Sequence, residues 1–429
     1  MRSRLPKSAI RCMLVLMVSS PVLAAEDAAP PPPEPSEAVP TAPEAATAPV
    51  PPVAPAPASA PEPASVMAAP PPAPPSFRIE PSKDTSIRIG LLLQPQFQSA
   101  SSATLDKYSN NLYIRRTRIL VGGTLFGTFD YFLDTDYPNL FLASAGGTEA
   151  NPTYQKATPG MNIQDAFGTW RAYNDMVKVD VGYMLPPGLH NAVQGATTLY
   201  SWDYFINSFP NRGNLFGGST SPVGRDVGVQ LRGLLVDGHL EYRAGLFQGV
   251  RNAPTLTEQG SRNFFRFAAR VQVNLLDAET GFFYQGTYLG KRKILSVGGT
   301  VDIQDSYKFF GGDAFVDFPI DPIGVVTAQV NVGHWDPGTL IPAAVLPAKE
   351  TAIMGEAGFI FSAAQVGPIL RFERLSPTGG NNQTRYVAGA AYFPYGHNIN
   401  LKAFYTRFHE VGAARDTNTF NLQWQLYFF

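Results

Sequence analysis

Cysteine is almost absent from this sequence, and its absence excludes several kinds of site. The only cysteine is Cys12, in a segment that we expect to be cleaved, so the mature chain would have no disulfide and no thiolate metal site. The five histidines form no HExxH or similar spacing, and no GxSxG, Walker A or dinucleotide-binding motif occurs. The sequence therefore predicts neither an enzyme nor a protein that needs a metal or another cofactor.

Charge and long apolar runs are also scarce. Charged residues make up 16% of the chain and the formal net charge is −1, whereas an average soluble domain has roughly 25% charged residues. A nearly neutral chain is not typical of a nucleic-acid binder. No run of ~20 apolar residues follows the N-terminus, which argues against a helical membrane protein. With 39 glycines and 12% aromatic residues, the composition fits a membrane β-barrel, and also a secreted β-sandwich.

The first 24 residues have the three parts of a secretory signal peptide. Basic residues come first, the apolar run Cys12–Val18 follows, and small residues surround Ala24. The apolar run is too short to serve as a membrane anchor. We expect residues 1–24 to be removed on export.

Residues 25–76 are a tract of proline, alanine and glutamate. It contains 19 of the 39 prolines, six acidic residues and no lysine or arginine. Such a tract cannot bury a core and is expected to be polyproline-like or disordered. We interpret it as a periplasmic arm, either a cell-wall contact or a passive linker, ahead of a barrel domain at 77–429.

From Thr85 onward, apolar residues recur at every second position, which indicates β-strands. The segments run about ten residues, the length that a tilted strand needs to cross a bilayer, whereas strands of soluble sandwiches average five or six. Short and longer connectors alternate between them, with 276–293 as a long exception that contains the ambiguous segment 281–289. We predict an all-β fold, a transmembrane antiparallel β-barrel of sixteen strands. The predicted strands start near residues 85, 112, 129, 162, 177, 225, 238, 262, 293, 307, 324, 351, 366, 384, 398 and 418.

Alternate residues of each strand should face lipid and lumen. We place Phe267 and Val271 toward lipid, and their neighbours Arg266 and Arg270 toward the lumen. Basic residues on the polar faces would attract anions, unless the acidic residues on the same faces pair with them and stiffen the wall. The predicted pore-lining and anion-binding residues are Arg88, Arg116, Arg118, Arg232, Arg243, Arg266, Arg270, Arg371 and Lys402.

The connector 185–224 is the third of the long loops. A loop of this length in a compact barrel is usually functional. If it folds into the lumen it forms the constriction, and the alternatives are an ordinary surface loop or a loop that packs between subunits. The predicted constriction residues are Tyr200, Trp202, Tyr204 and Arg212.

Residues 77–429 contain the stretches IRIGLLLQPQFQ (87–98), YIRRTRILVGGTLFGTFDYFLDTDY (113–137), IQDAFGTW (163–170), VDVGYMLPPG (179–188), GRDVGVQLRG (224–233) and YRAGLFQGV (242–250), and the sequence ends on Phe429. Together these features resemble the phosphate-selective porin O/P family of Gram-negative bacteria. The resemblance implies a sixteen-stranded, usually trimeric outer-membrane porin whose third loop narrows the pore, with anion or phosphate selectivity in some members. Within 185–224 the only basic residue is Arg212, so the lysine-rich loop of a phosphate trap is missing.

The sequence thus predicts an outer-membrane porin, surrounded by lipid, that passes small hydrophilic or anionic solutes without a cofactor. A homotrimer is the expected assembly. One alternative is a structural or plugged barrel that tethers the envelope through its arm. The other is a soluble secreted β-sandwich that binds ligands.

Overall fold

The computed structural model describes residues 77–101, 108–147, 152–205, 224–249, 264–341, 346 and 348–429. The predicted signal peptide (1–24), the predicted arm (25–76) and Arg212 lie outside the described residues. Within these ranges, no helix is long and apolar enough to cross a membrane.

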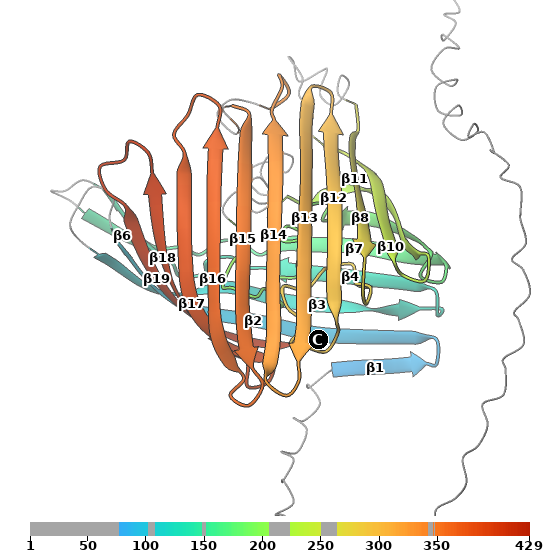
Figure 1. The fold of residues 1–429 in the computed structure, drawn as a ribbon. Coiled ribbons are helices and arrows are strands. Elements are labelled where there is room, and N and C mark those ends of the chain that lie inside the picture. The colour runs from blue at the N-terminus through green and yellow to red at the C-terminus, as the bar shows by residue number, and fades with distance from the viewer. Residues whose placement is uncertain are drawn as a thin grey trace, which may run out of the picture. The chain divides into compact units, whose positions relative to one another are not determined.

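Sixteen antiparallel strands form a closed barrel (Figure 1). Each strand pairs with its neighbours along the chain, and the last strand pairs with the first, so that Leu422 lies opposite Phe97. Closure leaves no strand edge unpaired, which is the condition for a β-structure in a bilayer. The barrel strands are β2 (Thr85–Ser101), β3 (Tyr108–Leu125), β4 (Phe129–Asp136), β7 (Asn162–Tyr173), β8 (Val177–Met184), β9 (Asp226–Leu235), β10 (Leu240–Phe247), β11 (Arg266–Asn274), β12 (Ile294–Gln304), β13 (Tyr307–Ile320), β14 (Gly324–Asp336), β15 (Glu350–Phe361), β16 (Val366–Pro377), β17 (Gln383–Tyr392), β18 (Ile399–Glu410) and β19 (Thr417–Phe428).

The sixteen predicted strands are confirmed, and each begins within four residues of its predicted start. The structure has three further short strands that are not among the sixteen strands of the barrel. β5 (Ala143–Gly147) and β6 (Pro152–Lys156) form a hairpin in the connector after β4. β1 (Phe77–Ser82) pairs with the first residues of β2, beyond the point where β19 ends.

The predicted register of the wall is also confirmed. Phe267 and Val271 are 36% and 52% exposed on the outer face, whereas Arg266 and Arg270 are each 1% exposed on the inner face. The same alternation holds in β19, where Leu422 and Trp424 face outward. The wall is therefore apolar outside and charged or polar inside, which is the pattern of a barrel surrounded by lipid.

The connectors differ between the two ends of the barrel. One end, called here the short-turn end, has connectors of a few residues at 126–128, 174–176, 236–239, 321–323, 362–365 and 393–398. The opposite end, the long-loop end, has the long connectors 137–161, 185–225, 248–265 and 337–349, together with shorter links such as 305–306 and 378–382. The predicted long connector 276–293 is present at the short-turn end, where it spans 275–293, and 281–289 is not a strand.

Candidate functional site

The connector after β8 enters the lumen from the long-loop end. Its residues 185–205, called here the lumenal loop, lie against the inner wall. The backbone N–H of His190 donates to Asp313 Oδ2 on β13 at 3.0 Å, and that of Asn191 donates to Asn331 Oδ1 on β14 at 3.0 Å. Tyr200 is 1% exposed in an apolar cluster contributed by β15, β16, β17 and β18. The loop therefore lies in the lumen, where a constriction requires it, and not on the surface.

Basic residues of the wall hold the far end of the lumenal loop. Arg115 and Arg116 of β3 donate to the carboxylate of Asp203 at 2.9 Å and 2.7 Å. From β16, Arg371 donates to the carbonyl of Asp203 at 2.6 Å, and from β18, Lys402 donates to the carbonyl of Ser201 at 3.0 Å. Burial alone would raise the pKa of Asp203, but Arg115 and Arg116 outweigh burial and hold it below its ordinary value. Asp203 is therefore an anion between two cations.

The other predicted constriction residues lie close to this anchor. Tyr204 donates its hydroxyl to the carbonyl of Gln194 at 2.9 Å, and Arg116 lies over its ring at 5.6 Å. Trp202 packs against the cluster that contains Tyr200. The three described aromatic residues are thus packed within the loop and against the wall.

Arg115 was not predicted to face the lumen, because strict alternation directs it outward. The ladder between β2 and β3 shifts at this point: Gln94 pairs with Arg116, but Pro95 pairs with Ile114. Proline has no N–H to donate to the ladder, and a bulge is where a strand accommodates it. The extra residue lets Arg115 and Arg116 both reach Asp203. The proline within a predicted strand was the sequence signal for this bulge.

A second insertion enters the lumen from the short-turn end. It is formed by residues 275–293, called here the lumenal turn. Arg243 of β10 donates to the carbonyls of Phe282 and Gly281 at 2.6 Å and 3.1 Å. On the other side, Thr287 donates to Asp317 Oδ2 of β13 at 2.7 Å. The turn is therefore fixed to walls on two sides, and sequence reasoning had given it no role.

The loop and the turn meet inside the barrel. Tyr284 N–H donates to the carbonyl of Val193 at 3.1 Å, and Gly195 N–H donates back to the carbonyl of Tyr284 at 2.9 Å. Gly286 N–H adds a bond to the carbonyl of Thr198 at 3.0 Å. A Cβ at Gly286 would lie 2.5 Å from the backbone nitrogen of Tyr200, so this approach requires glycine.

A buried polar pair joins the same two segments. Nε2 of His190 in the loop lies 3.0 Å from Oε2 of Glu279 in the turn, and both side chains are fully buried. The imidazole is stacked between Tyr284 and Phe315, with ring centroids 4.9 Å and 4.2 Å away. Burial would raise the pKa of Glu279. His190, with hydrogen bonds from Tyr288 and Gln272 to the carboxylate, outweighs burial and holds the pKa of Glu279 below its ordinary value. These side-chain and backbone contacts between loop and turn are called here the lumenal clasp.

The remaining predicted pore-lining arginines form close contacts with acids of the wall. Arg266 and Arg270 bind Asp302 and Asp313 through two hydrogen bonds each, at 2.6 to 2.9 Å. Arg118 bonds to Asp134 and Asp136, Arg232 to Asp180, and Arg243 to Glu241. Arg88 instead lies over the ring of Phe429 at 4.9 Å. Most of these cations are thus paired with acids of the wall and do not form a row of unpaired charges that could bind anions.

A cavity of about 190 Å³ lies between the clasp and the wall formed by β3 and β4. Arg118 and Asp134 line it from the wall, and residues 194–198 and 283–285 line it from the loop and the turn. Among the residues whose positions are described, no group of three or more His, Cys, Asp or Glu could hold a metal ion. The cavity is lined by paired charges and aromatic rings, which are groups that can bind small polar solutes.

The fold is a closed sixteen-stranded barrel with polar side chains on its inner face, and a barrel of this width can leave an aqueous lumen. Among solved structures, this fold is similar to an anion-selective porin from Comamonas acidovorans, with a TM-score of 0.53 and 10% identity over 80% of this chain and 100% of that chain. The Acinetobacter baumannii outer membrane channel DcaP gives a TM-score of 0.49 and 12% identity over 81% and 99% of the two chains. Salmonella typhi OmpF in complex with daunomycin gives 0.48 and 11% over 80% and 98%. No protein-family description and no curated protein matches the sequence. At this level of identity the likeness to the Comamonas porin shows the fold alone.

Proposed function

We propose that the protein is an outer-membrane porin that lets small hydrophilic solutes diffuse through a lumen narrowed from both ends. The observation that carries the proposal is the closed barrel of sixteen strands with an apolar outer face and a charged inner face. A barrel of this size has room for a water-filled path beside its inward segments. The lumenal loop and the lumenal turn would set the width of that path.

One observation favours a second candidate, the plugged structural barrel. The lumenal clasp joins two insertions from opposite ends by backbone hydrogen bonds and a buried side-chain pair. Single-channel recording of the purified full-length protein in a planar bilayer separates the two. Stepwise conductance supports the porin, whereas an inserted, heat-modifiable barrel without steps supports the plug. A soluble protein without heat-modifiable mobility would contradict both.

We also propose a preference for anions. The preference should be modest, because most lumenal arginines are paired with acids. The strongest control over selectivity should lie at Asp203, whose charge is balanced by Arg115 and Arg116. Asp203→Asn should shift the reversal potential in a salt gradient toward anions, since it leaves two guanidinium groups without their acid. Replacing both arginines by glutamine should shift it toward cations.

Asp237→Asn is the matched control for this selectivity experiment. It removes the same charge from the exposed short turn 236–239 and should leave the reversal potential unchanged. Equal reversal potentials for all variants would show that these residues only brace the wall. Replacing chloride by phosphate in the same cell tests for the selectivity that the resemblance to the phosphate-selective porin O/P family implies. A phosphate-selective pore would have a higher conductance in phosphate than in chloride.

Residues 25–76 are proposed to be a periplasmic spacer behind a cleaved signal peptide (1–24). A polyproline helix rises ~3.1 Å per residue, so about 50 residues could reach roughly 150 Å, far enough to touch the cell wall. Deleting 27–74 should change neither assembly nor single-channel conductance, because a spacer has no part in the barrel. Loss of heat-modifiable folding, or an altered conductance, would make the tract a folding element or a plug.

The homotrimer expected from the resemblance stays part of the proposal. Native mass spectrometry in mild detergent should give a mass of three copies. A single copy under conditions that preserve the folded barrel would contradict it.

A further inference from the structure

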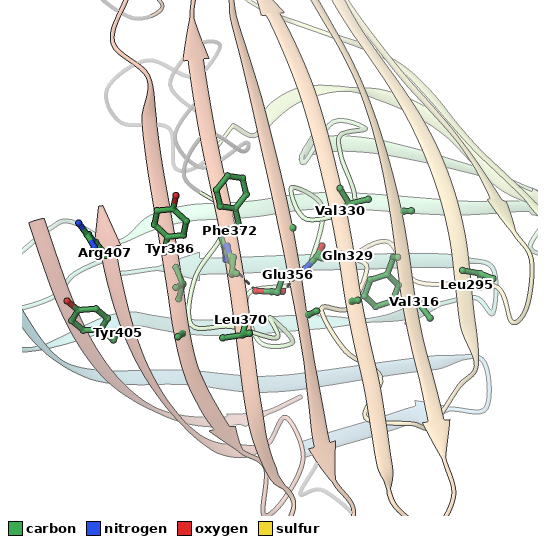
Figure 2. A pocket seen from close by; sticks show the side chains of 18 residues that line it. Leu295, Val316, Gln329, Val330, Glu356, Leu370, Phe372, Tyr386, Tyr405 and Arg407 are labelled. Atoms are coloured by element: carbon green, nitrogen blue, oxygen red, sulfur yellow. Dashed lines mark hydrogen bonds and ion pairs between the residues drawn. The ribbon is translucent and has the colours of Figure 1, made fainter. Parts of the chain in front are cut away.

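A large hollow lies on the outer face of the wall. It is a groove of about 990 Å³ across β12 to β18 (Figure 2). Leu370, Phe372, Tyr386 and Tyr405 border it with outward side chains that are 38% to 62% exposed. Gln329 and Glu356, which also contribute to its lining, are buried on the lumenal face. The groove therefore faces whatever surrounds the barrel.

The floor of the groove is made of the smallest side chains. In one cross-strand row, Ala328 pairs with Ala357, and Ala357 pairs with Leu370. In the next row, Val330 pairs with Gly355, and Gly355 pairs with Phe372. A Cβ placed on Gly355 would meet no atom within 4 Å. Alanine and glycine between larger neighbours thus leave a hollow that the protein itself does not fill.

The groove runs obliquely along the barrel from one end toward the other. It begins at Leu295, the second residue of β12 at the short-turn end, and reaches Arg407, near the long-loop end of β18. Seven strands lie side by side over this path, which at the usual interstrand spacing spans roughly 30 Å. An extended apolar ligand would therefore lie along it, with one end near the long-loop rim.

Cations gather at the rim end of the groove. Arg407 pairs across the strands with Tyr386, and Arg374 stands in the next row toward the long-loop end. Arg407 and His409 share one acid, Asp416, at 2.6 Å and 2.7 Å. The Nε of Arg374 donates to the hydroxyl of Ser376 at 3.3 Å, and no acid among the described residues forms an ion pair with Arg374. Arg374, Arg407 and Asp416 together therefore carry a net positive charge at this end of the groove, and guanidinium groups suit phosphate oxygens.

We propose that this groove binds a phosphorylated glycolipid of the outer leaflet. Its acyl chains lie over Ala328, Gly355 and Ala357, and its phosphate accepts hydrogen bonds from Arg374 and Arg407. The inference rests on the proposed membrane location, with the long-loop end outward. A hydrocarbon chain needs no polar partner along the groove, and Arg407, the outward charged residue of the described lining, lies at the end that the phosphate would occupy.

The test is native mass spectrometry of the full-length barrel in mild detergent with bisphosphorylated lipid A added. We expect one lipid molecule retained per copy of the chain. Gly355→Leu, which fills the floor, should weaken retention at least tenfold. Gly168→Leu is the matched control, because Gly168 is an outward glycine on the opposite wall, in β7, and it should retain the lipid fully.

A second pair of variants tests the headgroup. Arg374→Gln combined with Arg407→Gln should lower retention of the phosphorylated lipid and leave that of its dephosphorylated form unchanged. Lys308→Gln, which removes an outward charge near the long-loop end of β13, should have no effect.

Three results would overturn the inference. The first is equal lipid retention by Gly355→Leu and Gly168→Leu, and the second is equal retention of phosphatidylcholine and lipid A. The third is a change in the number of chains per particle without loss of lipid, which would make the groove a contact between copies of the chain. Single-channel recording of the same variants keeps the two proposals apart. A conducting barrel that retains no lipid refutes only the lipid site.

Discussion

Replacing residues 279–291 by a short Gly-Asn-Gly turn should raise the single-channel conductance several-fold. These residues fill the lumen from the short-turn end and hold the lumenal loop through Glu279 and Tyr284. The barrel wall should survive the change, because Asp277 N–H already donates to the carbonyl of Lys293 at 2.9 Å and closes the hairpin ahead of the insertion. Ionic conductance grows with the open cross-section, so removal of one of two insertions should be directly visible in the step size.

Glu279→Gln is the control for this experiment, because it keeps the turn in place and changes only the buried pair with His190. Its conductance should stay close to that of the unmodified protein, with more frequent transitions between levels if the pair holds the clasp shut. A shortened variant with unchanged step size would show that the ions pass along the opposite wall, and that the lumenal turn does not border their path.

Arg270→Met should destabilise the barrel by about 3–5 kcal/mol, because it leaves a buried carboxylate without its cation. Arg270 and Asp313 are each 1% exposed and share two hydrogen bonds of 2.6 Å and 2.7 Å. Arg270 also donates to the carbonyl of Gly188 at 3.1 Å, so the variant loosens the start of the lumenal loop as well. Urea unfolding in lipid vesicles, followed by tryptophan fluorescence, measures the free energy of unfolding.

The neighbouring position supplies a matched comparison. Val271→Arg puts a charge on the lipid face and should cost about 2–4 kcal/mol near the bilayer midplane. Adding Asp313→Asn to Arg270→Met should recover most of the lost stability, because the unpaired carboxylate is then gone while the amide oxygen can still accept from the His190 N–H. The same substitution should not rescue Val271→Arg. If the double variant is no more stable than Arg270→Met, the loss comes from packing and not from the unpaired charge.

The wall of the barrel could be predicted from the sequence because its signal is local. Apolar residues at every second position fix both the strand and the face, so Phe267 and Arg266 were assigned correctly without any knowledge of their neighbours. The candidate site could be predicted only in part, because its contacts join residues far apart in the chain. Nothing near Asp203 in the sequence indicates that it meets Arg116.

Two features of the site show why the rest was missed. Arg115 faces the lumen because Pro95 on the neighbouring strand shifts the ladder, and strict alternation cannot include a bulge. The inward path of 275–293 depends on Gly286, which allows contact with a loop some 90 residues earlier in the chain. The density of aromatic residues in that connector was the available signal, since Phe282, Phe283, Tyr284 and Tyr288 are unusual in a solvated turn.

The lumenal clasp also has a consequence for the order in which the molecule is built. The lumenal loop takes its partners from β3, β13, β14, β16 and β18, so its final place exists only after strands from both halves of the chain have come together. The lumenal turn is held in place by contacts with β10, β13 and the lumenal loop. We therefore expect the cylinder to close before its interior fills, so that the last intermediate of assembly has a wider lumen than the finished protein.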